Sequence, residues 1–179
     1  DLVSQAEHDP EAVALLATTS LRHAREVAAE VERRIEDLPR RAIAEESLRR
    51  NGRVLLVKDL HEAVEFSNRF APEHLVLMTK SPWTLFRRVR HAGAVFLGRY
   101  SPVSLGDFCA GPNHVLPTAG AGRVASGLST ADFVKTIAWQ EFTGTGIRRA
   151  ARTAEAIARV EGLEGHARAV RVRARESRP

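Results

Sequence analysis

The chain has 179 residues, of which 44% are hydrophobic and 27% are charged, and its formal net charge is +5. This size and composition predict one ordinary domain, or a domain with a small appendage, and exclude a disordered chain, a collagen and a disulfide scaffold. The longest apolar runs, at 12–17 and 54–57, are far shorter than the roughly 18 residues of a membrane span. We therefore expect no membrane partner, and no secretory signal opens the chain.

The first residue is Asp1 and the only methionine is Met78, which predicts a processed chain or a fragment. The basic excess can indicate a nucleic-acid partner, but 22 acidic residues are interleaved with the 27 basic ones and aromatic residues are only 6%. We therefore interpret the charge as solvated surface and expect no nucleic acid. The lone cysteine, Cys109, excludes an intrachain disulfide, and we expect a cytoplasmic location.

Up to residue 97 the spacing of apolar residues predicts strands and helices in alternation. The expected elements are an apolar run over 12–19, helices over 21–36 and 42–50, a strand over 54–57, a helix over 60–70 capped by Asp59, a strand over 75–78, a helix over 82–91 and a strand over 94–97. Because these strands are apolar throughout, we expect a parallel sheet covered by helices, which is an α/β fold.

The pattern changes after Gly98. Residues 98–127 are rich in Gly, Pro, Ser and Asn and show no periodicity, and a long irregular stretch inside a domain is usually functional. The remaining chain predicts helices over 129–142, 146–161 and 165–175. We therefore place a domain boundary near residue 127, with a small helical domain over 128–179.

Two short motifs carry polar chemistry in the first half of the chain. Gln5 and His8 lie three residues apart, so on a helix they would share one face and could reach one metal ion, although such a pair is more often a surface feature. Glu73 and His74 follow Pro72 where a helix gives way to a strand. A carboxylate beside an imidazole can supply two acid/base groups, but the spacing alone favours a surface dipeptide.

The segment 106–118 holds the densest chemistry, because Asp107, Asn113 and His114 stand among glycines and prolines that shape the loop. His166 follows Gly165 at the start of the last expected helix. Taken with His8 and Gln5, the side chains of Asp107 and His166 form a set of N and O ligands that zinc accepts. Spacing alone does not establish that residues so far apart meet.

Four motifs in chain order resemble histidinol dehydrogenase, a zinc- and NAD-dependent enzyme. They are DLVSQAEHD at 1–9, FAPEHL at 70–75, GDFCAGPNHVLPT at 106–118 together with SGLSTADFVK at 126–135, and EGLEGHARAV at 161–170. The resemblance implies that the chain is the C-terminal portion of such an enzyme. Residues 1–127 would then be the C-terminal half of a Rossmann-like α/β domain bearing most of the metal site.

The resemblance also implies a role for each matching residue. The zinc ligands would be Gln5, His8, Asp107 and His166, which would thereby also form the substrate site. Glu73 and His74 match the catalytic acid/base pair, and His74 would contact the substrate as well. His114 and Glu161 match further substrate contacts.

Members of this family oxidise L-histidinol through an aldehyde to L-histidine, the last step of histidine biosynthesis, and use two NAD in sequence. They are homodimers with intertwined subunits, so His166 would come from the partner chain and the helical domain 128–179 would be exchanged. Family members are much longer than this chain, and the additional N-terminal part carries most NAD contacts. We therefore expect no NAD-binding residues here and no activity of this chain alone.

Two differences from the family pattern border the expected pocket. Val103 stands where many members have Glu, and Phe108-Cys109-Ala110 stands where Tyr-Ala-Ser is common. They leave two alternatives open. One is a paralogous zinc- and NAD-dependent dehydrogenase that acts on another amino or hydroxy alcohol. The other is a non-catalytic, basic helical module for dimerisation or nucleic-acid binding.

Overall fold

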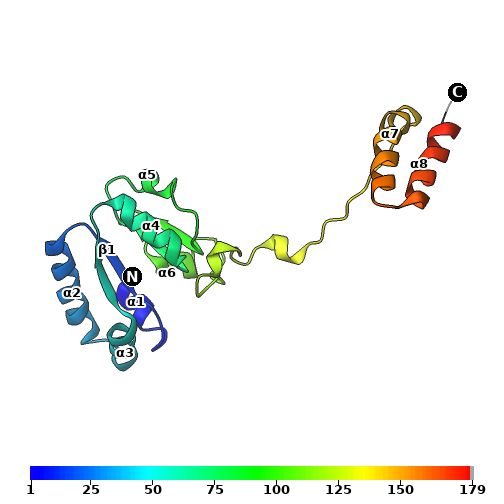
Figure 1. Ribbon diagram of the computed structural model, residues 1–179. Helices are drawn as coiled ribbons and strands as arrows, with labels where there is room; N and C mark the ends of the chain where they lie inside the picture. The colour runs from blue at the N-terminus through cyan, green and yellow to red at the C-terminus, as the bar shows by residue number, and fades with distance from the viewer. Residues whose placement is uncertain (178–179) are drawn as a thin grey trace. The chain divides into compact units, whose positions relative to one another are not determined.

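The computed structural model describes residues 1–177 and divides the chain into two compact units, Asp1–Phe133 and a second unit that begins at Val134. The elements of the first unit are α1 (Leu2–Ala6), β1 (Leu15–Thr18), α2 (Leu21–Ile35), α3 (Arg41–Asn51), β2 (Arg53–Leu56), α4 (Leu60–Phe70), β3 (His74–Leu77), α5 (Pro82–Phe86), β4 (Ala94–Leu97), α6 (Val103–Phe108) and 3₁₀ turns at Ala121–Arg123 and Thr130–Phe133 (Figure 1). The second unit contains α7 (Gly144–Val160) and α8 (Glu164–Glu176). None of the described helices is long and apolar enough to cross a bilayer.

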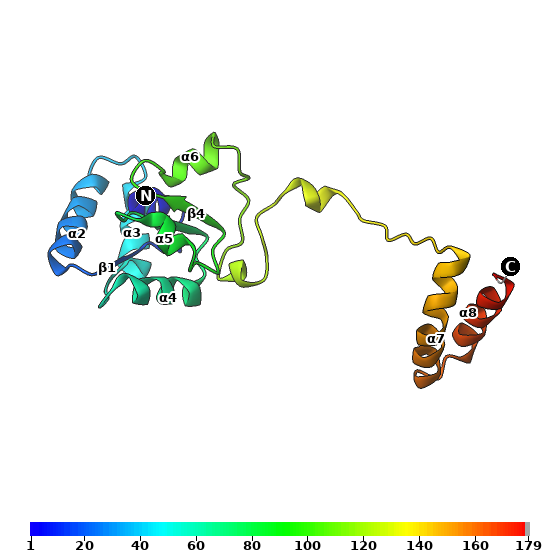
Figure 2. The ribbon, with the colours of Figure 1, turned by 90° about the horizontal axis from the view of Figure 1, so that it is seen from above.

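The strands of the first unit form two parallel pairs, which confirms the predicted α/β class. β1 pairs with β2, with Leu15 opposite Arg53, and β3 pairs with β4, with His74 opposite Ala94. Parallel neighbours need a crossover, and α2 with α3 supplies the first while α5 supplies the second. In the view of Figure 2, α6 and α4 flank the strands on opposite sides.

Helix packing holds the N-terminal end of this unit together. Ala6 on α1, Ile35 on α2 and Ala44 on α3 form a buried apolar cluster. The two alanines have no exposed surface. Small side chains let the three helices approach closely, so α1 is fixed even though it has only five residues.

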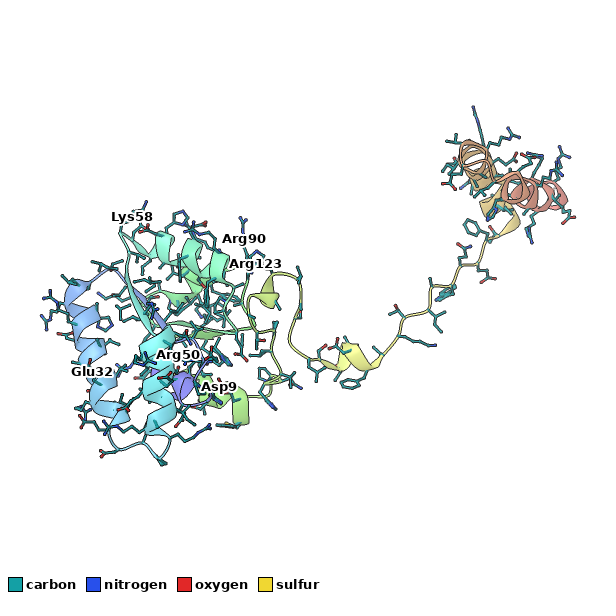
Figure 3. The ribbon with its side chains drawn as sticks, turned by 60° about the horizontal axis from the view of Figure 1, so that its bottom comes forward. Asp9, Glu32, Arg50, Lys58, Arg90 and Arg123 are labelled. Atoms are coloured by element: carbon teal, nitrogen blue, oxygen red, sulfur yellow. The ribbon has the colours of Figure 1, made fainter. Side chains whose placement is uncertain are left out.

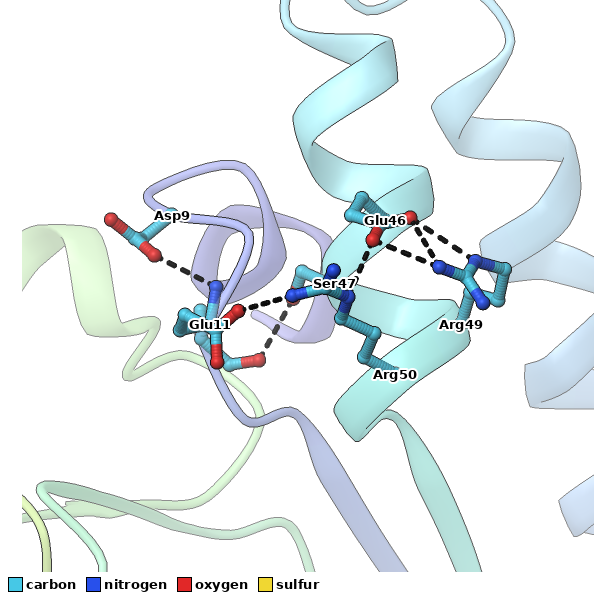
Figure 4. Close-up of polar contacts among 7 residues, drawn as sticks. Asp9, Glu11, Glu46, Ser47, Arg49 and Arg50 are labelled. Carbon is cyan, nitrogen blue, oxygen red and sulfur yellow. Dashed lines mark hydrogen bonds and ion pairs between the residues drawn. The ribbon is translucent and has the colours of Figure 1, made fainter.

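The segment between α1 and β1 is tied to α3 by polar contacts (Figure 4). The Ser47 hydroxyl is fully buried and donates to the Ala12 carbonyl at 2.9 Å. The Arg50 guanidinium lies 2.5 Å from the Glu11 carboxylate, and the Asp9 carboxylate accepts from the Glu11 backbone N–H at 2.7 Å. These contacts set the direction in which the chain leaves α1.

The second unit is a helical hairpin, as predicted for 146–161 and 165–175. Ala151, Ala158 and Ala167 are its buried residues, and small side chains allow close helix contact. Gly162 joins the helices with φ of 72°, a left-handed conformation that favours glycine. The Arg171 guanidinium of α8 reaches the Glu155 carboxylate of α7 at 2.9 Å.

The helix predicted over 129–142 is wrong. Only Thr130–Phe133 forms a 3₁₀ turn, because the Asp132 carboxylate accepts from the Ser129 backbone N–H at 2.7 Å and closes a local turn. The following residues up to the start of α7 have no regular structure, and Trp139 is 85% exposed. A short helix that buries no face is marginal in water, so apolar spacing alone does not produce one.

Three smaller differences concern element bounds. The predicted helix 82–91 ends at Phe86, and the stretch 98–127 contains α6, which the sequence did not predict. The α1 helix ends at Ala6, so His8 lies outside it and the expected shared helical face with Gln5 is wrong. The Val103 backbone N–H donates to the Asp1 carboxylate at 3.0 Å, which supports the start of α6.

Candidate active site

The candidate site is built around the His74 imidazole, which opens β3 and is 13% exposed. Its Nδ1 lies 3.2 Å from the Gln5 amide oxygen of α1. Its Nε2 lies 3.6 Å from a carboxylate oxygen of Asp107 in α6. Three elements that are far apart in the sequence therefore bring an amide, an imidazole and a carboxylate together.

Backbone contacts and close packing hold this arrangement. The backbone N–H groups of Gly93 and Ala94 donate to the carbonyls of Pro72 and Glu73, which aligns the start of β4 with the catalytic candidates. A Cβ on Gly93 would lie 2.6 Å from the Glu73 carbonyl oxygen, so this approach requires glycine.

The wall behind His74 is apolar. The Phe96 ring of β4 lies 6.0 Å from the His74 ring at an angle of 45°. The Cα of Gly106 in α6 lies so close to this phenyl ring that a Cβ there would come within 2.5 Å. Phe96 is not recognisable as a site residue from the sequence, because an aromatic residue inside an apolar strand gives no sign of facing a site.

The contact with Gln5 favours one tautomer of His74. In that tautomer the Nδ1 atom carries the proton and donates to the amide oxygen, which can only accept, and the Nε2 atom keeps its lone pair. Nε2 is buried and has no hydrogen-bond partner within the described part of the chain, since the Asp107 oxygen at 3.6 Å is too far away for a hydrogen bond. A buried imidazole nitrogen with a free lone pair can act as a general base or bind a metal ion.

Glu73 stands at the edge of the same site. One of its carboxylate oxygens lies 3.9 Å from His74 Nδ1, and its side chain is 30% exposed. It therefore combines contact with the imidazole and access to water. This is the arrangement in which a carboxylate can take a proton from a water molecule.

The other predicted site residues of the first unit lie on its surface. His8 is exposed, and its carbonyl accepts from the Arg40 guanidinium at 3.1 Å. His114 is exposed in the loop after α6, beside Asn113, whose side-chain oxygen accepts from the Val115 backbone N–H at 2.8 Å. The structure does not bring either histidine into contact with His74.

Glu161 and His166 belong to the second unit, where they line one groove of about 290 Å³ between α7 and α8. Apolar side chains form the rest of that groove, among them Ile157, Leu163 and Val170. Two residues that sequence reasoning named separately, one as a substrate contact and one as a metal ligand, are thus neighbours.

The predicted zinc ligands are therefore only partly assembled. In residues 1–177 no three His, Cys, Asp or Glu side chains converge as a metal site. The oxygens of Gln5 and Asp107 converge on His74 and fit a zinc ion in type. Of the two predicted nitrogen ligands, His8 is exposed on the first unit and His166 belongs to the second unit.

Comparisons with known proteins agree with the family that the motifs indicate. A sequence model of the family described as histidinol dehydrogenase matches residues 1–174. The chain belongs to the histidinol dehydrogenase family. Curated histidinol dehydrogenases from Geobacillus kaustophilus and a Synechococcus strain are 51% and 49% identical to it over 173 residues, which is 97% of this chain.

A solved structure carries the same fold. The crystal structure of histidinol dehydrogenase from Elizabethkingia anophelis matches with a TM-score of 0.95 and 36% identity over 98% of this chain. The matched region is 40% of that structure's chain, and 41% and 40% of the Geobacillus and Synechococcus relatives. This chain thus spans about two fifths of the histidinol dehydrogenases that it matches.

Proposed function

We propose that the polypeptide in which this chain occurs is a histidinol dehydrogenase, which oxidises L-histidinol to L-histidine through the aldehyde in the last step of histidine biosynthesis. The observation that carries the proposal is the meeting of Gln5, His74 and Asp107 beside Glu73. Family membership argues against a non-catalytic basic module. A cytoplasmic location suits the free thiol of Cys109.

In this proposal His74 takes the first proton. As the substrate alcohol becomes an aldehyde it loses a hydride and a proton, and the lone pair on His74 Nε2 accepts the proton. Gln5 holds the imidazole in the required tautomer. When bound by the complete polypeptide, NAD would supply the acceptor for the hydride.

Glu73 acts in the second oxidation. Water adds to the aldehyde, and the partly exposed Glu73 carboxylate removes a proton from that water. Loss of a second hydride, for which a second NAD would be the acceptor, then gives the carboxylic acid, which releases one more proton and becomes the carboxylate of L-histidine. We assign the two roles by the exposure of the two side chains. The buried His74 imidazole would act on the substrate alcohol, and the partly exposed Glu73 carboxylate would act on water.

Zinc would be held by Gln5, His8 and Asp107 of one chain and by His166 of a partner chain in a homodimer. When bound, the ion would orient the substrate through its amine and imidazole groups. His114, and Glu161 beside His166, would complete the substrate contacts. The helical unit would then be exchanged between the two subunits.

The direct test measures NADH formation from L-histidinol by the complete polypeptide and by its Glu73→Gln and His74→Asn variants. We expect turnover by the parent and a loss of about 10²- to 10⁴-fold in each variant, the range for a removed acid/base group. His23→Asn, a change on exposed α2, is the matched control and should keep full activity. Turnover of a different amino alcohol, without turnover of L-histidinol, would instead indicate the paralogous enzyme.

Zinc binding is tested separately by metal analysis of the purified polypeptide. We expect stoichiometric zinc, lowered more than about tenfold in occupancy at limiting metal by Asp107→Asn, because the neutral amide is a weaker ligand than a carboxylate. Asp37→Asn removes the same charge from an exposed position and should retain the metal. Full zinc content in the Asp107 variant would contradict the proposed ligand set.

A further inference from the structure

A second polar hollow lies in the first unit, apart from the candidate active site. It has a volume of about 410 Å³ and lies between the end of α4, the residues before β4 and the 3₁₀ turn at Ala121–Arg123. The residues that line it are Glu65, Asn68, Arg69, Arg90, His91 and Arg123, and we refer to them as the arginine hollow. Figure 3 shows the side chains of Arg90 and Arg123 close together beside α4.

The charge of the arginine hollow is unbalanced. Three arginines and one acidic residue, Glu65, line it, so its formal net charge is +2 when His91 is neutral. Within residues 1–177 none of these three arginines is ion-paired with a carboxylate. Elsewhere the helices neutralise arginine locally, as in the pairs Arg22–Glu26 and Arg41–Glu45.

The walls of the hollow are held in place by contacts that leave charge available. The Asn68 side chain accepts from the Arg90 backbone N–H at 2.7 Å and donates to the Arg88 carbonyl at 3.0 Å. This fixes the backbone of Arg90 against the end of α4 without using its guanidinium. The Arg123 guanidinium donates to the carbonyls of Gly120 at 3.1 Å and of Arg69, which fixes its plane at the rim.

We propose that the arginine hollow binds the phosphate group of a small anion. Guanidinium groups present planar pairs of donors that match phosphate oxygens, and a formal net charge of +2 matches a phosphate dianion. The volume exceeds that of phosphate alone and lies in the range of small-ligand pockets, so the group can be free phosphate or part of a monoester. None of the acid/base or metal candidates lines this hollow, which makes it a separate site.

Isothermal titration calorimetry of the complete polypeptide at constant ionic strength tests the proposal. The probes are inorganic phosphate and ribose 5-phosphate, titrated in chloride buffer. We expect saturable binding of at least one of them to one site per chain. If inorganic phosphate binds more tightly, the site is for the free ion. If ribose 5-phosphate binds more tightly, the site is for a monoester.

The variants Arg69→Gln and Arg90→Gln remove one guanidinium each from exposed positions without side-chain partners in the described chain, so they should fold normally. Each should weaken phosphate binding at least about tenfold, because a charge-assisted hydrogen bond is lost. Arg25→Gln on α2 is the matched control, since it removes the same charge from an element that does not line the hollow. Its affinity should equal that of the parent.

Three results would overturn the proposal. The first is that neither probe shows saturable binding up to about 10 mM, because a dissociation constant above that value is too weak for a specific site. The second is binding that Arg69→Gln and Arg90→Gln leave unchanged. The third is competition between phosphate and NAD, which would make the hollow part of the nucleotide site rather than a site of its own.

Discussion

At the scale of single residues, the surroundings of a side chain decide its role. His74 and His23 have the same chemistry, yet His74 is 13% exposed between an amide and a carboxylate, whereas His23 is 57% exposed on α2. Only the first has a tautomer favoured by its neighbours and a buried lone pair. The same reasoning applies to Ser47, the only fully buried hydroxyl that joins α3 to the segment after α1 in the described chain.

Ser47→Ala should therefore destabilise the protein. The change leaves the Ala12 carbonyl without the donor at 2.9 Å, and a buried group that loses its partner costs about 1–3 kcal/mol. Chemical denaturation of the parent and the variant measures the change in the free energy of unfolding. Ser104→Ala, an exposed serine on α6, is the control and should change it by less than about 0.5 kcal/mol. Equal effects of the two changes would show that the Ser47 contact does not contribute.

At the scale of elements, the ends of helices determine where the site residues lie. α4 runs from its Asp59 cap to Phe70, and β3 with His74 follows after only three residues. The Asp59 carboxylate accepts from the Glu62 backbone N–H at 2.8 Å. Ala71 ends the helix with φ of 55°, which turns the chain directly into the Pro72–Glu73 segment.

The Asp59 cap predicts a pH-dependent stability. The hydrogen bond from the Glu62 backbone N–H, aided by nearby positive charge, lowers the pKa of Asp59 below its ordinary value of 3.8. The ionised cap thus stabilises the fold above pH 3.8, and this contribution is lost as the pH falls through the lowered pKa. Asp59→Ala should lower the melting temperature at pH 7, and the difference from the parent should narrow only below pH 3.8.

Thermal unfolding monitored by circular dichroism between pH 7 and about pH 3 measures this difference. Asp59→Asn keeps an oxygen acceptor without a charge that titrates. Its melting temperature should lie between those of the parent and the alanine variant at pH 7. A gap between parent and Asp59→Ala that stays constant over the whole range would show that the carboxylate charge does not stabilise α4.

At the scale of the whole molecule, the described chain leaves apolar surface and site residues without partners. Parallel strands are usually covered on both faces, yet Val54 and Leu56 of β2 are 45% and 57% exposed. Ile137 and Trp139, which precede α7, are 76% and 85% exposed. Because the matched relatives are about two and a half times longer, their further residues are natural candidates to cover such surface.

The proposed exchange of the helical unit predicts complementation between two inactive variants of the complete polypeptide. Glu73→Gln damages the first unit and His166→Ala the second, so a mixed dimer with exchanged helical units contains one intact site. Co-expression with separate affinity tags should then restore about a quarter of the parent activity, because half of the dimers are mixed and each has one of two sites. If each chain built its own site, every site in the mixture would be damaged and no activity would return.

The sequence by itself determined the features that depend on neighbouring residues. The apolar runs predicted the strands that became β2, β3 and β4, their parallel direction and the apolar segment that holds β1, and the Asp59 cap marked the start of α4. The family follows from motifs that need no coordinates. Local pattern is sufficient for these features because propensity, capping and patterning act over a few residues.

Only the tertiary structure decided which residues meet and which helices persist. Gln5, His74 and Asp107 converge because α1, β3 and α6 pack together, and no spacing in the sequence encodes those distances. The stretch 134–143 has an apolar pattern that suits a helix, but its large apolar side chains are exposed in the described chain and pack against no other element. It therefore forms no helix. The physical reason is the same in both cases: burial against a partner segment provides the free energy that local pattern lacks.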